Sequence, residues 1–213
     1  MPLSAIRSAS ICLLIGGLGL TGWNPVSAQT APERGVFVTQ IGENAVASVT
    51  QTNADSFARI VQEGDGNEVE LDQNGAAVQR AQIVQNGDNN NVLAQQEGSV
   101  VLALAQEGNQ NIAVTFQNES LANAQTTAAV VQSGNGNSLM LAQDGSNNSA
   151  ELNQVGDDNT MTATQLGNSN QLEWTQIGNG LSDLGIVQTG NGNLQITQSA
   201  AGAQFTLPPG SGG

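Results

Sequence analysis

Residues 143–176 read QDGSNNSAELNQVGDDNTMTATQLGNSNQLEWTQ, and this stretch repeats one pattern three times. Each copy begins with Gln, has Gly two residues later and Asn three residues after that, and the next Gln follows six residues further on. A fixed period is typical of proteins built from stacked structural repeats. Neither amide does chemistry alone, so we expect a structural role for both.

The same Gln recurs along most of the chain. Successive copies are 11 residues apart, except for two intervals of 10, two of 12 and one of 15. The longest interval, which starts with residues 117–121, is interpreted as a loop insertion. The positions are Gln40, Gln51, Gln62, Gln73, Gln85, Gln96, Gln106, Gln117, Gln132, Gln143, Gln154, Gln165, Gln176, Gln188 and Gln198.

Glycine follows the repeated Gln two positions later in 12 of 14 cases, and Asn53 and Glu119 are the exceptions. Gly, Asn and Asp tolerate the positive φ angles that tight turns need, so the chain is predicted to turn just after each Gln. The predicted turn glycines are Gly42, Gly64, Gly75, Gly87, Gly98, Gly108, Gly134, Gly145, Gly156, Gly167, Gly178 and Gly190.

The segments between turns alternate with a period of two, as half-buried strands do. The residues two and four positions before each Gln should share its face, and 29 of these 30 residues are apolar and none is charged. The interleaved positions hold residues such as Glu68, Glu70 and Asp72, so that face should meet water. No helix is needed anywhere in the repeat region.

Strand and turn in alternation, at about 22 residues per strand pair, predict an all-β fold: a β-solenoid whose coils stack about 4.8 Å apart with amyloid-like cross-β order. Residues 34–198 should form about seven two-strand coils and one further strand. A flat interior between two facing sheets suits Ala and Val. Trp174 is wide for it, so we expect a local bulge or an outward flip there.

Stacking answers why the amides repeat, because an amide can donate to the copy above it and accept from the copy below. The Gln residues should form such ladders at one end of each inward face, and polar residues six positions earlier should do so at the other end. These residues are Ser56, Asn67, Asn90, Asn111, Asn137, Asn148, Asn159, Asn170 and Ser182, with Thr126 in an equivalent place.

The N-terminal residues resemble a secretory signal peptide, with Arg7 followed by an apolar run over 11–20 and small residues at Ser27 and Ala28. We expect residues 1–28 to be removed, residues 29–33 to be a flexible leader and residues 199–213 to be a disordered tail. The apolar run is about half the ~20 residues that a membrane span needs, so no integral membrane segment is expected in the mature chain. Cys12 would be lost with the signal, which leaves no disulfide.

The formal net charge is −14, with four Arg and no Lys. Nucleic acids are bound through clusters of basic residues, so no nucleic-acid partner is expected. The absence of His and Tyr, and of Cys after the signal, removes most general bases, nucleophiles and transition-metal ligands. We therefore expect no enzyme activity, no metal and no cofactor.

The pattern resembles the curlin repeat, written Ser, five residues, Gln-x-Gly-x-x-Asn-x-Ala, three residues, Gln. Residues 56–73 follow it, with Ser56, Gln62, Gly64, Asn67 and Gln73 in place and Val69 where Ala is usual. The resemblance covers residues 34–198 and implies a subunit, major or minor, of curli, the extracellular amyloid fibres of bacterial biofilms. It also implies a companion curlin-like subunit, export through an outer-membrane pore with chaperones, and ladders built from the inward Ser, Gln and Asn.

Strand edges at the two ends of such a solenoid invite the addition of another copy. The last coil, residues 184–198, is expected to template the first coil, residues 34–51, of the next molecule. This predicts a homopolymeric head-to-tail fibre that serves adhesion and aggregation at the cell surface.

A solenoid that does not polymerise is the alternative, either a passive adhesin or a protein with a binding surface. Ice-binding solenoids use stacked Thr-x-Thr rows, and Thr160, Thr162 and Thr164 form one such row. The GDGN and GDDN turns at 64–67 and 156–159 suggest a cation-binding surface, although most turns here carry Asn or Ser in place of carboxylates.

Overall fold

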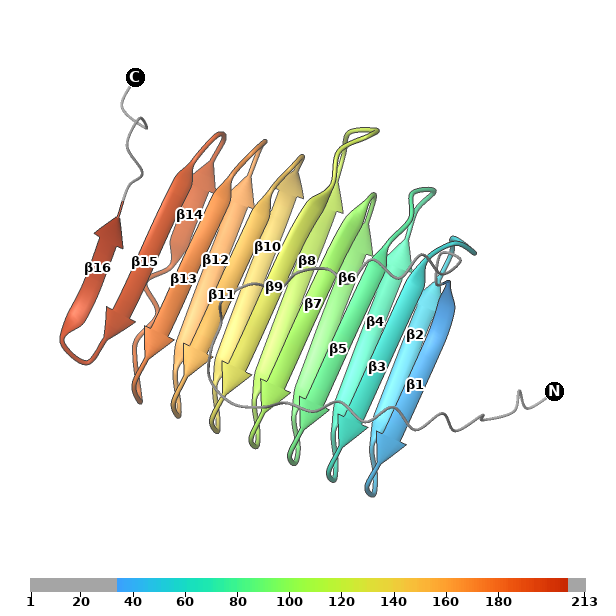
Figure 1. Ribbon diagram of the computed structural model, residues 1–213, viewed down its shortest axis with the longest axis horizontal. Coiled ribbons are helices and arrows are strands. Elements are labelled where there is room, and N and C mark those ends of the chain that lie inside the picture. The colour runs from blue at the N-terminus through green and yellow to red at the C-terminus, as the bar shows by residue number, and fades with distance from the viewer. Residues whose placement is uncertain (1–33, 207–213) are drawn as a thin grey trace, which may run out of the picture. The chain divides into compact units, whose positions relative to one another are not determined.

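Strands alternate with tight turns throughout residues 34–206, the part of the chain that the computed structural model describes. Sixteen strands form two sheets, and these residues contain no helix (Figure 1). The odd sheet consists of β1 (Gly35–Ile41), β3 (Phe57–Glu63), β5 (Arg80–Asn86), β7 (Val100–Glu107), β9 (Thr126–Ser133), β11 (Ser149–Val155), β13 (Gln171–Ile177), β15 (Asn193–Ser199) and β16 (Gly202–Thr206). The even sheet consists of β2 (Val46–Gln51), β4 (Glu68–Asn74), β6 (Asn91–Glu97), β8 (Ile112–Glu119), β10 (Ser138–Gly145), β12 (Thr160–Leu166) and β14 (Ile186–Thr189).

Neighbouring strands of each sheet are parallel and in register, except that β16 is antiparallel to β15. Each repeated Gln is therefore paired with the next Gln of its own sheet, for example Gln40 with Gln62 and Gln143 with Gln165. From β1 to β15 consecutive strands lie in opposite sheets, so one turn of the solenoid takes two strands. β1 to β14 make seven coils and β15 begins an eighth, which confirms the predicted β-solenoid.

Alternation along the strands determines the core. The side chains that point between the two sheets form one continuous apolar cluster that includes Ile60, Leu71, Ile83, Leu141 and Leu152. Small residues such as Ala58, Ala94 and Ala163 are equally buried. The two sheets therefore pack closely enough that Ala and Val fill the interior.

Trp174 lies in this interior and is fully buried, so the predicted bulge or outward flip near it is wrong. β13 keeps its register past this residue, with Trp174 between Leu152 and Ile196. Its indole Nε1 has no hydrogen-bond partner in the described part of the chain. The irregularity lies instead in the following segment, before the four-residue strand β14.

The C-terminal segment departs from the predicted disordered tail. β16 folds back on β15, and Gln198 is paired with Ala203. Figure 1 shows β16 as the outermost strand of the odd sheet. The chain reverses direction after Ser199, which breaks the 11-residue period, but β16 still supplies backbone hydrogen-bond partners to the outer edge of β15. The predicted signal peptide (1–28), the leader (29–33) and residues 207–213 lie outside the described residues.

Candidate functional site

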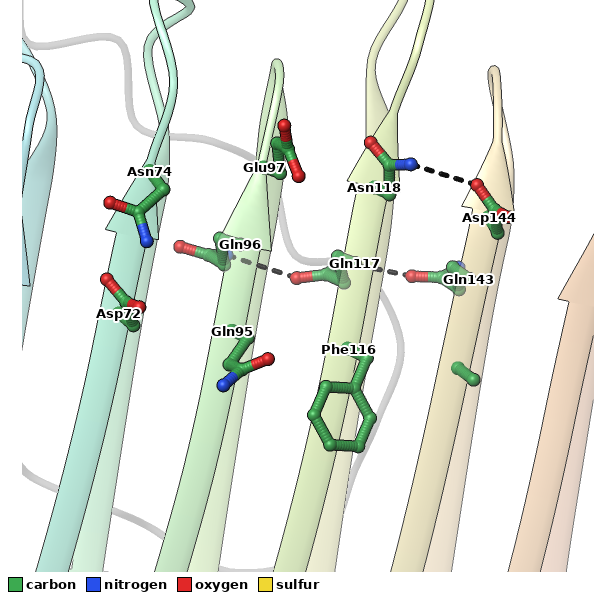
Figure 2. Close-up of a pocket in the computed structure, with 11 residues that line it drawn as sticks. Asp72, Asn74, Gln95, Gln96, Glu97, Phe116, Gln117, Asn118, Gln143 and Asp144 are labelled. Carbon is green, nitrogen blue, oxygen red and sulfur yellow. Dashed lines mark hydrogen bonds between the residues drawn. The ribbon is translucent and has the colours of Figure 1, made fainter.

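The repeated Gln residues form two ladders, one at the carboxyl ends of the strands of each sheet. In each ladder Nε2 of one Gln donates to Oε1 of the next, over 2.6 to 3.0 Å. Figure 2 shows three successive members, Gln96, Gln117 and Gln143. The odd-sheet ladder joins Gln40, Gln62, Gln85, Gln106, Gln132, Gln154, Gln176 and Gln198, and the even-sheet ladder joins Gln51, Gln73, Gln96, Gln117, Gln143, Gln165 and Gln188.

The same amides also tie the two sheets together. Nε2 of Gln62 donates to the Val46 carbonyl over 3.1 Å, and Nε2 of Gln96 donates to the Arg80 carbonyl over 3.3 Å. Each acceptor lies at the start of a strand in the opposite sheet. A ladder Gln thus satisfies its buried polar atoms along the stack and across it at once.

Asparagine forms a further column at the turns that lead into the even sheet. The backbone N–H of each Asn donates to Oδ1 of the preceding one over 3.0 to 3.1 Å. The column begins at Asn67 and runs through Asn90, Asn111, Asn137 and Asn159. The equivalent column at the other turns is mixed in type and consists of Ser56, Gln79, Val100, Thr126, Asn148, Asn170 and Gly192.

Two positions of these columns differ from the sequence prediction. Ser182 is exposed, and Leu181 takes its place, with its N–H donating to Asn159 Oδ1 over 3.0 Å. One extra residue between Leu181 and Gln188 causes this, because the chain bulges at 182–185 and pushes Ser182 outward. Gln79 was missed, although it is six residues before Gln85 and its Oε1 accepts the Ser56 hydroxyl.

Turn glycines occupy two columns. Gly42, Gly64, Gly87, Gly108, Gly134, Gly156 and Gly178 lie in turns from the odd to the even sheet, and Gly75, Gly98, Gly145, Gly167 and Gly190 lie in the others. All of them have positive φ. A Cβ on Gly134 would lie 2.0 Å from the Gly156 carbonyl oxygen, so successive coils approach too closely for any side chain there.

The residue after each glycine of the first column makes a ladder that the sequence prediction missed. The backbone N–H at this position donates to the side-chain oxygen of its successor over 2.7 to 3.0 Å. The signal was present, because every such glycine after Gly42 is followed by Asp or Asn. The accepting residues are Asp65, Asp88, Asn109, Asn135, Asp157 and Asn179.

Glu119 stands where most repeats have the turn glycine, at the start of the loop insertion, and its side chain is buried. Burial raises the pKa of this carboxyl, but hydrogen bonds from Ser146, the Leu121 and Asn147 amides and Thr126 lower it, and the net pKa is below the ordinary value. The carboxylate thus ties the inserted loop, through the Leu121 amide, to the turn of the next coil, through the Asn147 amide.

We expect Glu119→Gln to lower the free energy of unfolding by about 2 kcal/mol at pH 7, because an amide oxygen cannot accept all these hydrogen bonds. A depressed folded-state pKa contributes stability above the unfolded pKa and loses it as pH falls through the folded value. The difference between wild type and variant should therefore shrink on acidification.

Thermal unfolding followed by circular dichroism at pH 7 and pH 3 measures this difference. The exposed Glu97→Gln is the control and should match wild type at both values. A difference for Glu119→Gln that grows toward pH 3 would contradict the assigned role.

Other kinds of site are not apparent in residues 34–206. This region has no group of three or more His, Cys, Asp or Glu side chains that could hold a metal ion, and no helix long and apolar enough to cross a membrane. A hollow of about 340 Å³ lies at the carboxyl ends of β4 to β10, beside Asp72, Phe116 and Asp144 (Figure 2).

Two facing parallel sheets, one coil per two strands and amide ladders along the stack define the class: a β-solenoid with cross-β hydrogen bonding. Residues 125–156 and 134–167 match the curlin associated repeat, which confirms the resemblance to curlins. The matched residues cover β9 to β12. No curated protein and no solved structure matches the chain.

Proposed function

We propose that the chain is a structural subunit that joins end to end with its own copies into an extracellular curli-type fibre. The observation that carries this proposal is the open first coil. Val36 and Val38 point inward but are 44% and 42% exposed, because no described residue covers β1 on its outer side. A second copy stacked on this coil would bury them as every later coil buries its neighbour.

The ladders favour one direction of joining. Nε2 always donates toward the C-terminal end, so Oε1 of Gln40 and of Gln51 receives no hydrogen bond from any described residue. At the other end, Nε2 of Gln188 donates to the Gln171 carbonyl and to no further Gln in the described region. Head-to-tail joining supplies the missing partners, whereas head-to-head joining would oppose two acceptors.

The C-terminal end requires a correction to the expected template. The sequence predicts that residues 184–198 template the first coil of the next copy. In the structure β16 covers β15, and at this end of the described residues β14 alone is an open parallel edge. In the proposed fibre, β14 receives β2 of the next copy, and β16 leaves β15 so that Gln198 can reach Gln40.

The repeat match and the sequence support a wider role, which is part of the proposal. Biofilm adhesion and aggregation, export through a pore with chaperones, a companion curlin-like subunit and a cell-surface location all belong to this proposal. It involves no catalysis, cofactor or nucleic acid, in keeping with a net charge of −14 and the lack of His and Lys.

Val38→Asp should abolish fibre formation, because joining would bury an unpaired carboxylate that the free molecule leaves partly in water. Val78→Asp is the matched control, since Val78 is 36% exposed and lies in a turn away from both ends. Electron microscopy and fibre diffraction of the purified chains measure the outcome. We expect fibres with a reflection at about 4.7 Å from wild type and Val78→Asp alone.

Circular dichroism must show the same β content for both variants, so that loss of fibres is not loss of folding. Fibres from Val38→Asp at the wild-type rate would contradict joining through β1. A wild-type chain that stays monomeric at high concentration would contradict the function itself.

A further inference from the structure

The middle of the odd sheet presents a small-residue surface to the outside. Before their carboxyl ends, the outward side chains of β7 and β9 are Val101, Ala103 and Ala105, and then Thr127, Ala129 and Val131, with no charge among them. Glu107 and Ser133 follow at the carboxyl ends. Val131 is 43% exposed, and Ala129 is also exposed. We call the first six of these residues the central patch. Its side chains are short, so another flat sheet can approach it closely.

Charges of opposite sign flank the central patch. One row of the sheet, read through its strand register, carries Arg59 on β3, Gln82 on β5, Ala103, Ala129, Glu151 on β11 and Glu173 on β13. Among the described residues only Arg34 makes an ion pair, with Asp55, so Arg59 has no acidic partner there. The row is therefore positive at one side of the patch and negative at the other.

We propose that the odd sheets of two copies pack face to face, about a two-fold axis that runs parallel to the strands between β7 and β9. This axis places β3 over β13, β5 over β11 and β7 over β9 of the other copy. Arg59 then faces Glu173 of the second copy, and Gln82 faces Glu151. The contact is isologous, so each of these pairs occurs twice.

The remaining acids of this face fit the same arrangement. Glu63 would meet Ile177 of the second copy and Glu107 would meet Ser133, so no two like charges are opposed. A hollow of about 270 Å³ beside Glu151 and Glu173 offers room for the Arg59 side chain. Gln195 donates to Glu173 Oε2 and leaves its other oxygen for the guanidinium.

The even sheet does not offer this match. Its outward face carries Glu68, Glu70 and Asp72 on β4 but no Lys or Arg within the described residues. Pairing of two even sheets would therefore gain no ion pair. The odd sheet is the face on which a second copy meets both an apolar centre and complementary charges.

The test compares Arg59→Glu, Glu173→Arg and the double exchange. Sedimentation equilibrium is run on chains that also carry Val38→Asp, so that end-to-end growth does not obscure a dimer. Each single exchange should weaken the dimer roughly tenfold or more, since two pairs change from attraction to repulsion. The double exchange should restore the wild-type dissociation constant.

A second pair of variants tests the patch itself. Ala129→Glu should reduce dimerisation by roughly a hundredfold, because it buries carboxylates without partners. Ala142→Glu makes the same change on the outward face of the even sheet and should have no effect. If the double exchange did not restore dimerisation, the proposal would be overturned. If Ala142→Glu weakened the dimer as much as Ala129→Glu, the odd sheet of one copy would pack on the even sheet of the other, and the proposal would also be overturned. If Val38→Asp formed fibres in electron microscopy, end-to-end joining through β1 would be refuted, but the face-to-face dimer would not.

Discussion

The Gly134→Ala variant is expected to lose about 4 kcal/mol of folding stability, although it adds a single methyl group. Gly134 has a φ of 120°, in a region that side-chain-bearing residues rarely adopt. The new Cβ would also lie 2.0 Å from the carbonyl oxygen of Gly156 in the next coil. Relieving this contact requires the coils to separate, which stretches the hydrogen bonds on both sides.

Gly180→Ala is the matched control for this prediction. Gly180 also has positive φ, at 64°, but a Cβ there would meet nothing within 4 Å. We expect a loss of about 1 kcal/mol, the usual cost of a left-handed conformation for Ala. Urea unfolding followed by circular dichroism compares the two variants. Equal losses of stability in the two variants would show that the column of turn glycines is required by backbone conformation alone, and not by the close approach of the coils.

The sequence predicts the fold well because one period encodes two physical requirements. An interval of 11 residues takes the chain from the carboxyl end of one strand to the carboxyl end of the next strand, which lies in the opposite sheet and at the opposite edge of the stack. Two intervals return the chain to the same column. Alternation before each Gln then determines which side chains face inward. For this reason the sequence alone predicts the pairing of Gln62 with Gln85 in neighbouring strands of one sheet.

The sequence does not predict the features that break the repeat, because spacing does not show where an extra residue bulges out of the regular strand. Counting back from Gln188 places Ser182 in the column, but spacing cannot tell on which side of a bulge the extra residue falls. The width of Trp174 suggested a defect in its own strand, yet β13 stays regular and the bulge lies in the segment that completes the same coil. β16 escapes prediction because its pairing is antiparallel and leaves no periodic trace.

Replacement of one ladder amide should have an effect of similar size to that of Gly134→Ala. Gln96→Leu keeps the volume of a side chain that is 2% exposed but removes three hydrogen bonds. Oε1 of Gln96 accepts from Gln73 over 2.7 Å, and its Nε2 donates to Gln117 Oε1 and to the Arg80 carbonyl. We expect a loss of about 4 kcal/mol, since each buried group left without a partner costs about 1–3 kcal/mol.

Gln95→Leu provides the control one residue away on the same strand. Gln95 points outward from β6, is exposed and makes no side-chain hydrogen bond within residues 34–206 (Figure 2). Its replacement should change the free energy of unfolding by less than about 0.5 kcal/mol. Urea unfolding followed by circular dichroism gives the free energy of unfolding of both variants. The difference between them measures the loss of the ladder hydrogen bonds, because both variants exchange the same amide for the same apolar side chain. If Gln96→Leu proved as stable as Gln95→Leu, the coils would be held by backbone pairing and core packing, and the period of Gln would need another cause.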